Sequence, residues 1–559
     1  MNFWEHFARV LPYRPIQALT ALYWHATRRR VRARNRLRVA SSDLPFAYEY
    51  WIRTYERIPD FTPQFRSSIK AWHWHPRFSV VLYSDVAATA AQRDLSIQSL
   101  HRQIYTSSTL VEADVTTLHA GITAADGDYV LLLRAGDVLS EAALFHLAEA
   151  LQTNRDAAIL YGDHDELDHE GRRRRPWFKP RWNEEMFLGQ DYLTPLVAID
   201  TALARAAIEE AHDDVANLVL TATCRATRAI IHVPHILCHT SPRAAELQET
   251  DRGEALARHL RGLGATCAPG PFGTTKVQWP LPDELPMVSI IIPTKDKLHL
   301  LQPCVDGVLL LTNYDAFEIL IVDNGSRERR TAEYLAAIGK NPKVRVIEYP
   351  HPYNFSAINN FAVGHARGPY LCLLNNDTEV IEPSWLTELM RYAVRPDVGA
   401  AGAKLIYKDG TIQHAGVVIG IGEAAGHAHR LLPADDAGYF LQPHVAQFVS
   451  AVTAACLVVD KTKYLAVGGL DQESFAIAFN DVDFCLKLEK AGWKNVYVPH
   501  ARLVHHESKS RGRDSSPSNI DRYRRELHAL QQRWGTKTYD DPLHNPNLDR
   551  HSETFVVRQ

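Results

Sequence analysis

Two stretches of this chain repeat each other in type and order, and this repetition constrains the fold most. FSVVLYS at 78–84 resembles VSIIIPT at 288–294, and GDYVLLLRAGD at 127–137 resembles GPYLCLLNND at 368–377. Each is a strand-length apolar run that ends in small or polar residues. Two matches in the same order predict an internal duplication of a large unit. The interval between the matches is 31 residues shorter in the first copy.

The longer interval, in the second copy, alternates between two patterns. Apolar residues recur at helical spacing from Leu298 to Val308 and again in RRTAEYLAAIG, whereas FEILIVD and VRVIEYP read as strands. Strands that alternate with helices predict a mostly parallel sheet covered on both faces. We therefore expect an α/β chain with two such sheet domains in tandem.

The chain has 559 residues, more than one ordinary core accommodates. Segments rich in proline and glycine mark a linker between the copies. We predict the following division: an N-terminal helical and basic segment at 1–77, a degenerate domain at 78–270, a linker at 271–286, a catalytic domain at 287–515, and a C-terminal helix and tail at 516–559.

Composition excludes several classes of protein. The net charge of −3 argues against a nucleic-acid partner, and the seven cysteines include no C-x-x-C pair, as expected for reduced thiols in a cytosol. No apolar run approaches the ~18 residues of a membrane span, and no signal peptide is visible. These features predict a cytoplasmic protein.

The N-terminal segment carries aromatic residues such as Trp4, Phe7, Tyr23 and Trp24 ahead of an arginine-rich block at 28–38. Aromatic residues beside clustered arginines can lie on an anionic bilayer. This pattern predicts peripheral contact with the inner face of the plasma membrane. The alternative is a helix packed on the main body with a solvated basic face.

Two acids follow strands of the second copy. Asp323 follows FEILIV, and Asp377 follows YLCLLNN. The ends of parallel strands share one rim, where ligands of such sheets bind, so the two acids can converge there. Asp377, flanked by amides, is a hard-oxygen environment suited to Mg²⁺ or Mn²⁺, which would neutralise a diphosphate. Each acid alone is equally compatible with an ordinary turn.

Two further segments carry candidate chemistry. Asp481 and Asp483 begin the helical stretch NDVDFCLKLEK, where an acid can serve as a general base or only stabilise the helix dipole. His505 and His506 end an apolar run and could bind a metal or phosphate. Arg511, in the basic stretch that follows, could close over a diphosphate, although a plain surface loop explains it as well.

The order VSIIIPT, VDNGS, LNNDTEV, GGLDQ, NDVDFCLKL, HHESKSRG resembles the family-2 glycosyltransferases. More narrowly, it resembles the two-copy bacterial enzymes of O-antigen and surface-polysaccharide assembly, often described as rhamnosyltransferases. The resemblance implies GT-A folds, a nucleoside-diphosphate sugar donor, a divalent metal, a lipid-linked glycan acceptor and inversion at the anomeric carbon.

The resemblance also implies roles for individual residues. Asp481 would be the catalytic base. The metal would be bound by Asp377 with His505 or His506, although Asn-Asn-Asp here replaces the Asp-x-Asp of many members and leaves one strong carboxylate ligand. The donor would be bound by the following residues: Pro293, Thr294, Asp323, Asn324, Asn376, Asp483 and Arg511.

The first copy departs from this pattern. Aligning the glycines places Gly136 at the position of Asp377, with Asp137 one place late, and Asp114 reads as a remnant of Asp323. We expect this copy to scaffold or to bind the acceptor. The alternatives are a transferase with two active sites, an inactive scaffold in a polysaccharide assembly complex, and a metal-dependent phosphohydrolase.

Overall fold

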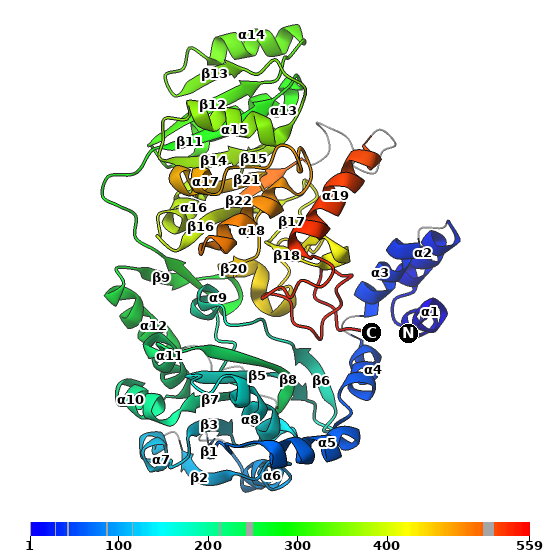
Figure 1. The fold of residues 1–559 in the computed structure, drawn as a ribbon, viewed down its shortest axis with the longest axis vertical. Helices are drawn as coiled ribbons and strands as arrows, with labels where there is room; N and C mark the ends of the chain where they lie inside the picture. The colour runs from blue at the N-terminus through cyan, green and yellow to red at the C-terminus, as the bar shows by residue number, and fades with distance from the viewer. Residues whose placement is uncertain are drawn as a thin grey trace.

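The computed structural model describes residues 2–27, 30–41, 44–84, 88–114, 116–211, 214–241, 250–506 and 519–559. Five helices precede two α/β domains, which are stacked along the long axis of the molecule (Figure 1). Within these ranges, no helix combines the length and the apolar character that crossing a membrane requires.

The N-terminal helices fall into two groups. Three of them pack around a small core of their own that includes Val10, Ala21 and Leu37. The last two run along the first domain (Figure 1). The five helices are α1 (Phe3–Val10), α2 (Pro15–Ala26), α3 (Arg30–Ser41), α4 (Pro45–Tyr55) and α5 (Ile58–Ala71).

The first domain is built on a sheet in the order β2-β1-β3-β7-β5-β8-β4, with β6 beside β5. Its strands are β1 (Phe78–Ser84), β2 (Ser108–Asp114), β3 (Tyr129–Arg134), β4 (Val138–Leu139), β5 (Ile159–Leu167), β6 (Arg173–Trp177), β7 (Val197–Asp200) and β8 (Ile230–Thr240). Its helices are α6 (Ala90–His101), α7 (Leu118–Ala124), α8 (Ala143–Thr153), α9 (Glu184–Gly189), α10 (Thr201–Ala211), α11 (Val215–Arg225) and α12 (Thr250–Gly262).

A hairpin of β9 (Thr266–Pro269) and β10 (Thr275–Gln278), with the short η2 (Pro271–Gly273), leads to the second domain. The second sheet has the order β13-β12-β11-β14-β21-β16-β22-β15. Its strands are β11 (Val288–Thr294), β12 (Phe317–Asp323), β13 (Val344–Glu348), β14 (Tyr370–Leu374), β15 (Thr378–Val380), β16 (Val398–Ile406), β17 (Ile412–His414), β20 (Gln447–Val449), β21 (Cys456–Asp460) and β22 (Lys494–His505).

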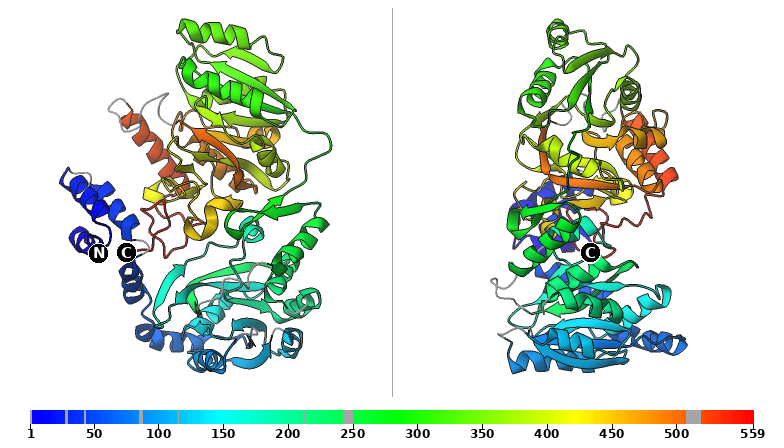
Figure 2. Two further views of the ribbon diagram at one scale, coloured as in Figure 1. Left: turned by 180° about the vertical axis from the view of Figure 1, so that it is seen from behind. Right: turned by 90° about the vertical axis from the view of Figure 1, so that its left-hand side faces the viewer.

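Helices cover both faces of this second sheet (Figures 1 and 2). They are α13 (Leu298–Leu311), α14 (Arg329–Ile338), α15 (Phe355–His365), α16 (Trp385–Ala393), α17 (Lys461–Ala466), α18 (Asn480–Lys490) and α19 (Ile520–Trp534). The remaining short elements are β18 (Val417–Ile419), η3 (Ile421–Glu423), β19 (Ala425–His427) and η4 (Tyr439–His444).

The two sheets repeat one topology, which confirms the predicted tandem α/β architecture. β1 lies parallel between β2 and β3, as β11 lies between β12 and β14. β7 inserts antiparallel between β3 and β5, as β21 inserts between β14 and β16. β5 and β8 pair in parallel like β16 and β22. In its described residues the first sheet has no strand equivalent to β13, in line with the shorter interval in its sequence.

The glycine that begins each repeated motif meets the same steric limit. A Cβ on Gly127 would lie 2.7 Å from the carbonyl oxygen of Arg77, and one on Gly368 would lie 2.5 Å from that of Met287. The backbone N–H of Gly127 donates to Ser79, and that of Gly368 donates to Ser289, both at 2.9 Å. Close backbone approach therefore explains why both copies have glycine here.

The domains are joined by buried contacts in addition to the linker. The rings of Trp177 and Phe440 stack with centroids 4.2 Å apart. Arg395 forms an ion pair with the buried Glu185, and its guanidinium lies 4.2 Å from the centroid of Trp279. Residues 541–559, here called the C-terminal tail, lie between the two domains (Figure 1).

Candidate active site

The parallel strands β11, β12 and β14 end at one rim of the second sheet. Thr294, the last residue of β11, pairs in register with Asp323, the last residue of β12. The side-chain amide of Asn376 donates to the Thr294 hydroxyl at 3.0 Å, while Pro293 pairs with Val322 one step deeper in the sheet. The structure thus places Thr294, Asp323 and Asn376 at one rim of the sheet.

Asp323 is held by the turn that follows it. Its Oδ1 accepts from the backbone N–H of Ser326 at 3.0 Å and from the Ser326 hydroxyl at 2.6 Å. The neighbouring Asn324 is buried, and its amide donates to the backbone oxygens of Tyr349 and His351. Asn324 therefore shapes the wall of the rim by fixing the segment after β13.

Asp377 and His505 form a buried pair, with Oδ1 of Asp377 3.1 Å from Nε2 of His505. Burial by itself would raise the pKa of Asp377, but the hydrogen bond and charge of His505 outweigh it, so the pKa lies below its usual value. Nδ1 of His505 lies 2.9 Å from Oε1 of Gln413, which fixes the ring orientation. Asn375 also faces Nε2 of His505, at 3.3 Å.

The second histidine of the motif points elsewhere. Nε2 of His506 lies 3.2 Å from a carboxylate oxygen of Glu379, and its backbone N–H donates to the carbonyl oxygen of Asp377 at 2.9 Å. His505, and not His506, therefore faces the Asp377 carboxylate. Across the described ranges, no group of three or more His, Cys, Asp or Glu side chains is arranged to hold a metal.

Asp481 stands at the first turn of α18, next to the same rim. Its Oδ2 accepts from the backbone N–H of Ala454 at 3.2 Å, and the adjacent Ala455 accepts from the backbone N–H of Asn375 at 3.0 Å. Asp481 is thus two hydrogen bonds from the Asn375–Asp377 loop. Phe479, the residue before α18 and two positions before Asp481, has a φ of 60°, a strained conformation that needs support from its surroundings.

Helix α19 supplies that support. The carboxylate of Glu526 accepts from the backbone N–H groups of Ile477 and Ala478 at 3.2 and 3.0 Å, just before Phe479. We expected a terminal helix here from the sequence but no contribution to the site. Glu526 and Gln413 are the positioning residues that the sequence did not indicate.

Asp483 faces α19 and not the rim. It is fully buried, and its Oδ1 accepts from Arg533 and from the indole N–H of Trp534, both at 2.9 Å. In the structure, this carboxylate anchors α19 against α18. Arg511, predicted to close over a diphosphate, lies outside the described residues.

Strand pairing corrects the alignment of the first copy. Val138 of β4 pairs opposite His239, as Thr378 of β15 pairs opposite His505, so Asp137 and not Gly136 corresponds to Asp377. The glycine alignment was wrong because the first copy has one extra residue between β3 and this position.

The acid of the first copy has a structural role. Asp137 is fully buried, and its Oδ1 accepts from the backbone N–H and the hydroxyl of Ser241. The equivalent histidine, His239, lies 2.6 Å from Asp165 instead. At the end of β2, Asp114 pairs with Ser84 as Asp323 pairs with Thr294, so it is the topological counterpart of Asp323.

Comparison with known proteins assigns the second domain. Residues 289–455 match the family described as "Glycosyl transferase family 2". The second domain is a family 2 glycosyltransferase domain. The predicted family resemblance is therefore confirmed over residues 289–455, which include Thr294, Asp323 and Asp377.

Three curated proteins are similar to this chain. The "Uncharacterized protein y4gI" of Sinorhizobium fredii is 40% identical over 459 residues, which cover 78% of this chain and 50% of that protein. The "O-antigen biosynthesis protein RfbC" of Myxococcus xanthus is 34% identical over 500 residues, 85% of this chain and 38% of that protein. The chain thus spans half or less of the length of these two relatives. The third matches only a short segment.

This third relative is the "N-acetylglucosaminyl-diphospho-decaprenol L-rhamnosyltransferase" of Mycobacterium tuberculosis. It is 42% identical over 66 residues, which are 12% of this chain and 21% of that protein.

Proposed function

We propose that the family 2 domain moves a sugar from a nucleoside diphosphate to a hydroxyl of a growing, lipid-linked bacterial surface glycan of the O-antigen kind, with inversion. One observation carries this proposal: Thr294, Asp323, Asn376, Asp377 and Asp481 lie around one rim, where strand pairing and short hydrogen bonds hold together the segments that carry them. The names of two relatives, in O-antigen biosynthesis and in transfer to a lipid diphosphate, support the choice of acceptor.

In this reaction the Asp481 carboxylate removes the proton from the acceptor hydroxyl as its oxygen attacks the anomeric carbon. The bond to the diphosphate breaks at the same time, and the nucleoside diphosphate leaves. Asp323 would orient the nucleotide, and Thr294, Asn324 and Asn376 would form the walls around it. Attack from the face opposite the leaving group inverts the anomeric carbon.

The residues present fit a divalent cation, Mg²⁺ or Mn²⁺, at Asp377 and His505. The buried Asp377 carboxylate and the His505 imidazole face each other at 3.1 Å and would hold the ion through an oxygen and a nitrogen ligand. Such ions commonly take one or two protein ligands and complete their shell with phosphate oxygens and water. When bound, the ion would neutralise charge on the departing diphosphate.

Asp481→Asn tests the proposal in a single substitution. We expect it to lower kcat for transfer by about 10²- to 10⁴-fold, because it removes a general base. The KM for the donor should stay unchanged, because the nucleotide-binding rim is untouched. Products should be separated chromatographically with a labelled nucleotide sugar and a glycan acceptor.

The same experiment separates the alternatives. Loss of every linkage agrees with one active site, whereas retention of one linkage would indicate a second site in the first domain. Release of sugar phosphate without an acceptor would identify a phosphohydrolase. No turnover of any donor by the unmodified protein would leave only the scaffold role.

We also infer that α1, α2 and the turn between them contact the inner face of the plasma membrane. Five large apolar side chains are exposed there by 55–75%, namely Trp4, Tyr13, Ile16, Leu19 and Tyr23. The first 41 residues contain nine arginines and one acid, Glu5. An apolar face with a basic surround fits an anionic bilayer by both burial and charge.

Vesicle sedimentation tests this contact. Full-length protein should bind vesicles that contain phosphatidylserine more tightly than phosphatidylcholine vesicles, and Ile16→Ser with Leu19→Ser should abolish the difference. Leu263→Ser, which changes a side chain 50% exposed elsewhere, is the control. The inference would be contradicted if the double variant bound phosphatidylserine vesicles as tightly as the unmodified protein does.

A further inference from the structure

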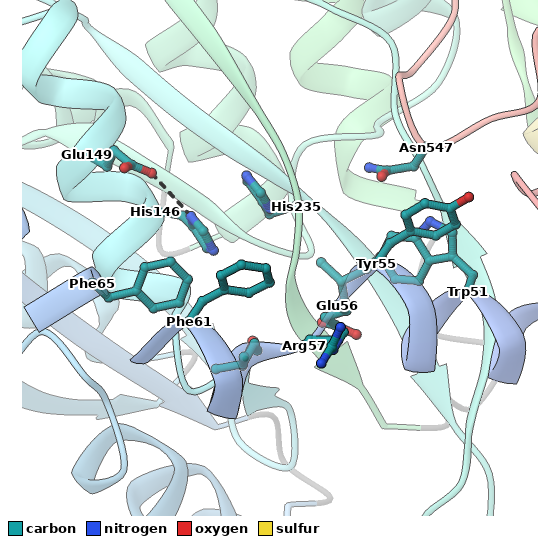
Figure 3. Close-up of a pocket in the computed structure, with 13 residues that line it drawn as sticks. Trp51, Tyr55, Glu56, Arg57, Phe61, Phe65, His146, Glu149, His235 and Asn547 are labelled. Atoms are coloured by element: carbon teal, nitrogen blue, oxygen red, sulfur yellow. Dashed lines mark ion pairs between the residues drawn. The ribbon is translucent and has the colours of Figure 1, made fainter. Parts of the chain in front are cut away.

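A cavity of about 320 Å³ lies where α4 and α5 meet the first domain (Figure 3). Its walls come from these helices, from α8 and β8, and from Asn547 of the C-terminal tail. The volume falls at the lower end of the range of about 300–1,000 Å³ for small-molecule sites. None of the lining residues belongs to the sheet that carries the proposed active site, so the cavity is a separate site.

Aromatic rings form two sides of this cavity. Figure 3 shows Phe61 and Phe65 on one side and Trp51 and Tyr55 on the other. Phe61 is 44% exposed and Tyr55 is 37% exposed, although both rings line a concave surface. Trp51 is held rigidly, because its ring stacks on that of Tyr48 at 5.6 Å. Phe61 and Tyr55 thus leave part of their ring surface open to a ligand, while the guanidinium of Arg558 lies 4.9 Å from the centroid of the Tyr55 ring.

Polar atoms lie between the aromatic sides. The indole N–H of Trp51 is buried and has no hydrogen-bond partner, although buried donors are almost always paired. His146 and His235 stack with ring centroids 3.8 Å apart, and both line the cavity. Burial lowers the pKa of His235 to about 3, so this ring is neutral at physiological pH. The Trp51 nitrogen is closed off from solvent, so the polar groups open to a ligand are those of Glu149 and Asn547.

Two charged groups at the cavity, Glu56 and Arg57, are paired with opposite charges, and Glu149 lies beside a histidine. Glu56 lies 2.6 Å from Arg173, and Arg57 lies 2.5 Å from Asp60. Glu149 lies 3.5 Å from His146. A carboxylate at the wall, beside the paired charges of Glu56 and Arg57, favours a neutral ligand over a phosphate or a nucleotide.

We propose that this cavity binds a sugar ring of the growing glycan, at a distance from the active site. A pyranose ring has an apolar face of C–H groups, which packs on aromatic side chains, and a rim of hydroxyls, which exchanges hydrogen bonds with groups such as the Glu149 carboxylate and the Asn547 amide. The inference rests on the proposed function for the identity of the glycan. It gives the first domain a binding role in holding the acceptor.

The test uses full-length protein that carries Asp481→Asn, so that turnover does not consume the ligand. Saturation-transfer NMR and calorimetry would measure binding of delipidated surface polysaccharide and of methyl glycosides of common hexoses and 6-deoxyhexoses. We expect binding to persist in Asp481→Asn and to weaken at least tenfold when Phe61→Ala or Tyr55→Ala is added. Leu95→Ala, which truncates a side chain 40% exposed on α6, is the matched control and should bind normally.

Several outcomes would overturn the proposal. These are unchanged affinity in both aromatic variants, absence of binding by every sugar tested, or binding only of a detergent or an apolar peptide included in the panel. Thermal unfolding of each variant checks that the fold is intact. Donor turnover by the unmodified protein is measured separately, so a failure of the cavity is distinguishable from a failure of the proposed function.

Discussion

At the scale of single residues, His505 and His506 are adjacent in sequence but have different surroundings. His505 faces Asp377 and is oriented by Gln413, whereas His506 faces Glu379. Adjacent residues of a strand point to opposite sides. This geometry assigns one histidine to the proposed cation site and leaves the other outside it.

We therefore expect His505→Ala to raise the Mn²⁺ or Mg²⁺ concentration needed for half-maximal transfer by about 10- to 100-fold, the usual effect of losing a group that binds or orients at a metal site. Metal titrations of activity, and of thermal stability with a nucleoside diphosphate present, would measure the shift. His506→Ala is the matched control. Equal shifts in the two variants would contradict the assignment of His505 alone.

At the scale of secondary-structure elements, α19 braces the start of α18. Glu526 fixes the two backbone N–H groups before the strained Phe479, and Asp483 is anchored to Arg533 and Trp534. The orientation of the Asp481 carboxylate therefore depends on a helix that contributes no group to the reaction.

Glu526→Gln should lower kcat about tenfold with little change in the donor KM, because a glutamine has one acceptor oxygen where the carboxylate has two. A tenfold loss in rate is what a small displacement of the Asp481 carboxylate would cause. Steady-state kinetics would show the split between kcat and KM. Asp521→Asn, at an exposed position on the same helix, should behave like the unmodified protein. A loss of stability in Glu526→Gln with equal effects on kcat and KM would instead indicate a merely structural role for Glu526.

The strands and helices were predictable from the sequence because both copies keep the hydrophobic periodicity of these elements. Alternating strand and helix patterns predicted the tandem sheets, and acids directly after strands predicted the rim. The offset of Asp137 was not predictable, because a single extra residue leaves both motifs intact and shows only in the pairing of β4 with β8. The brace by Glu526 depends on packing between segments about 50 residues apart, which a helical pattern does not reveal. The direction of the Asp483 side chain was not predictable either, because it depends on the packing of α19 against α18.

At the scale of the whole molecule, the C-terminal tail closes over buried histidines. The ring of Phe555 stacks on that of His429, with centroids 4.7 Å apart, and lies tilted to that of His544, with centroids 5.8 Å apart. Burial lowers the pKa of His429 to about 3 and that of His544 to about 4. Both histidines are therefore neutral in the folded protein.

Because the unfolded chain binds protons on these histidines below pH 6.5 and the folded chain does not, stability is full above pH 6.5 and falls as the pH drops toward 4. Between pH 6.5 and 5.0, each histidine should lower the free energy of unfolding by about 2 kcal/mol. Urea unfolding at the two pH values would measure the difference. His544→Gln should reduce the loss of unfolding free energy between the two pH values, whereas His299→Gln, at an exposed site, should not. The same loss in His544→Gln as in the unmodified protein would refute the explanation.

The tail also has a consequence for biosynthesis. Asp163, buried in the first domain, accepts a hydrogen bond from Asn545, which lies 382 residues later. While the ribosome is still making the second domain, this carboxylate lacks that partner. The first domain therefore reaches its final packing only after residue 545 has emerged, so the two halves mature together and not in succession.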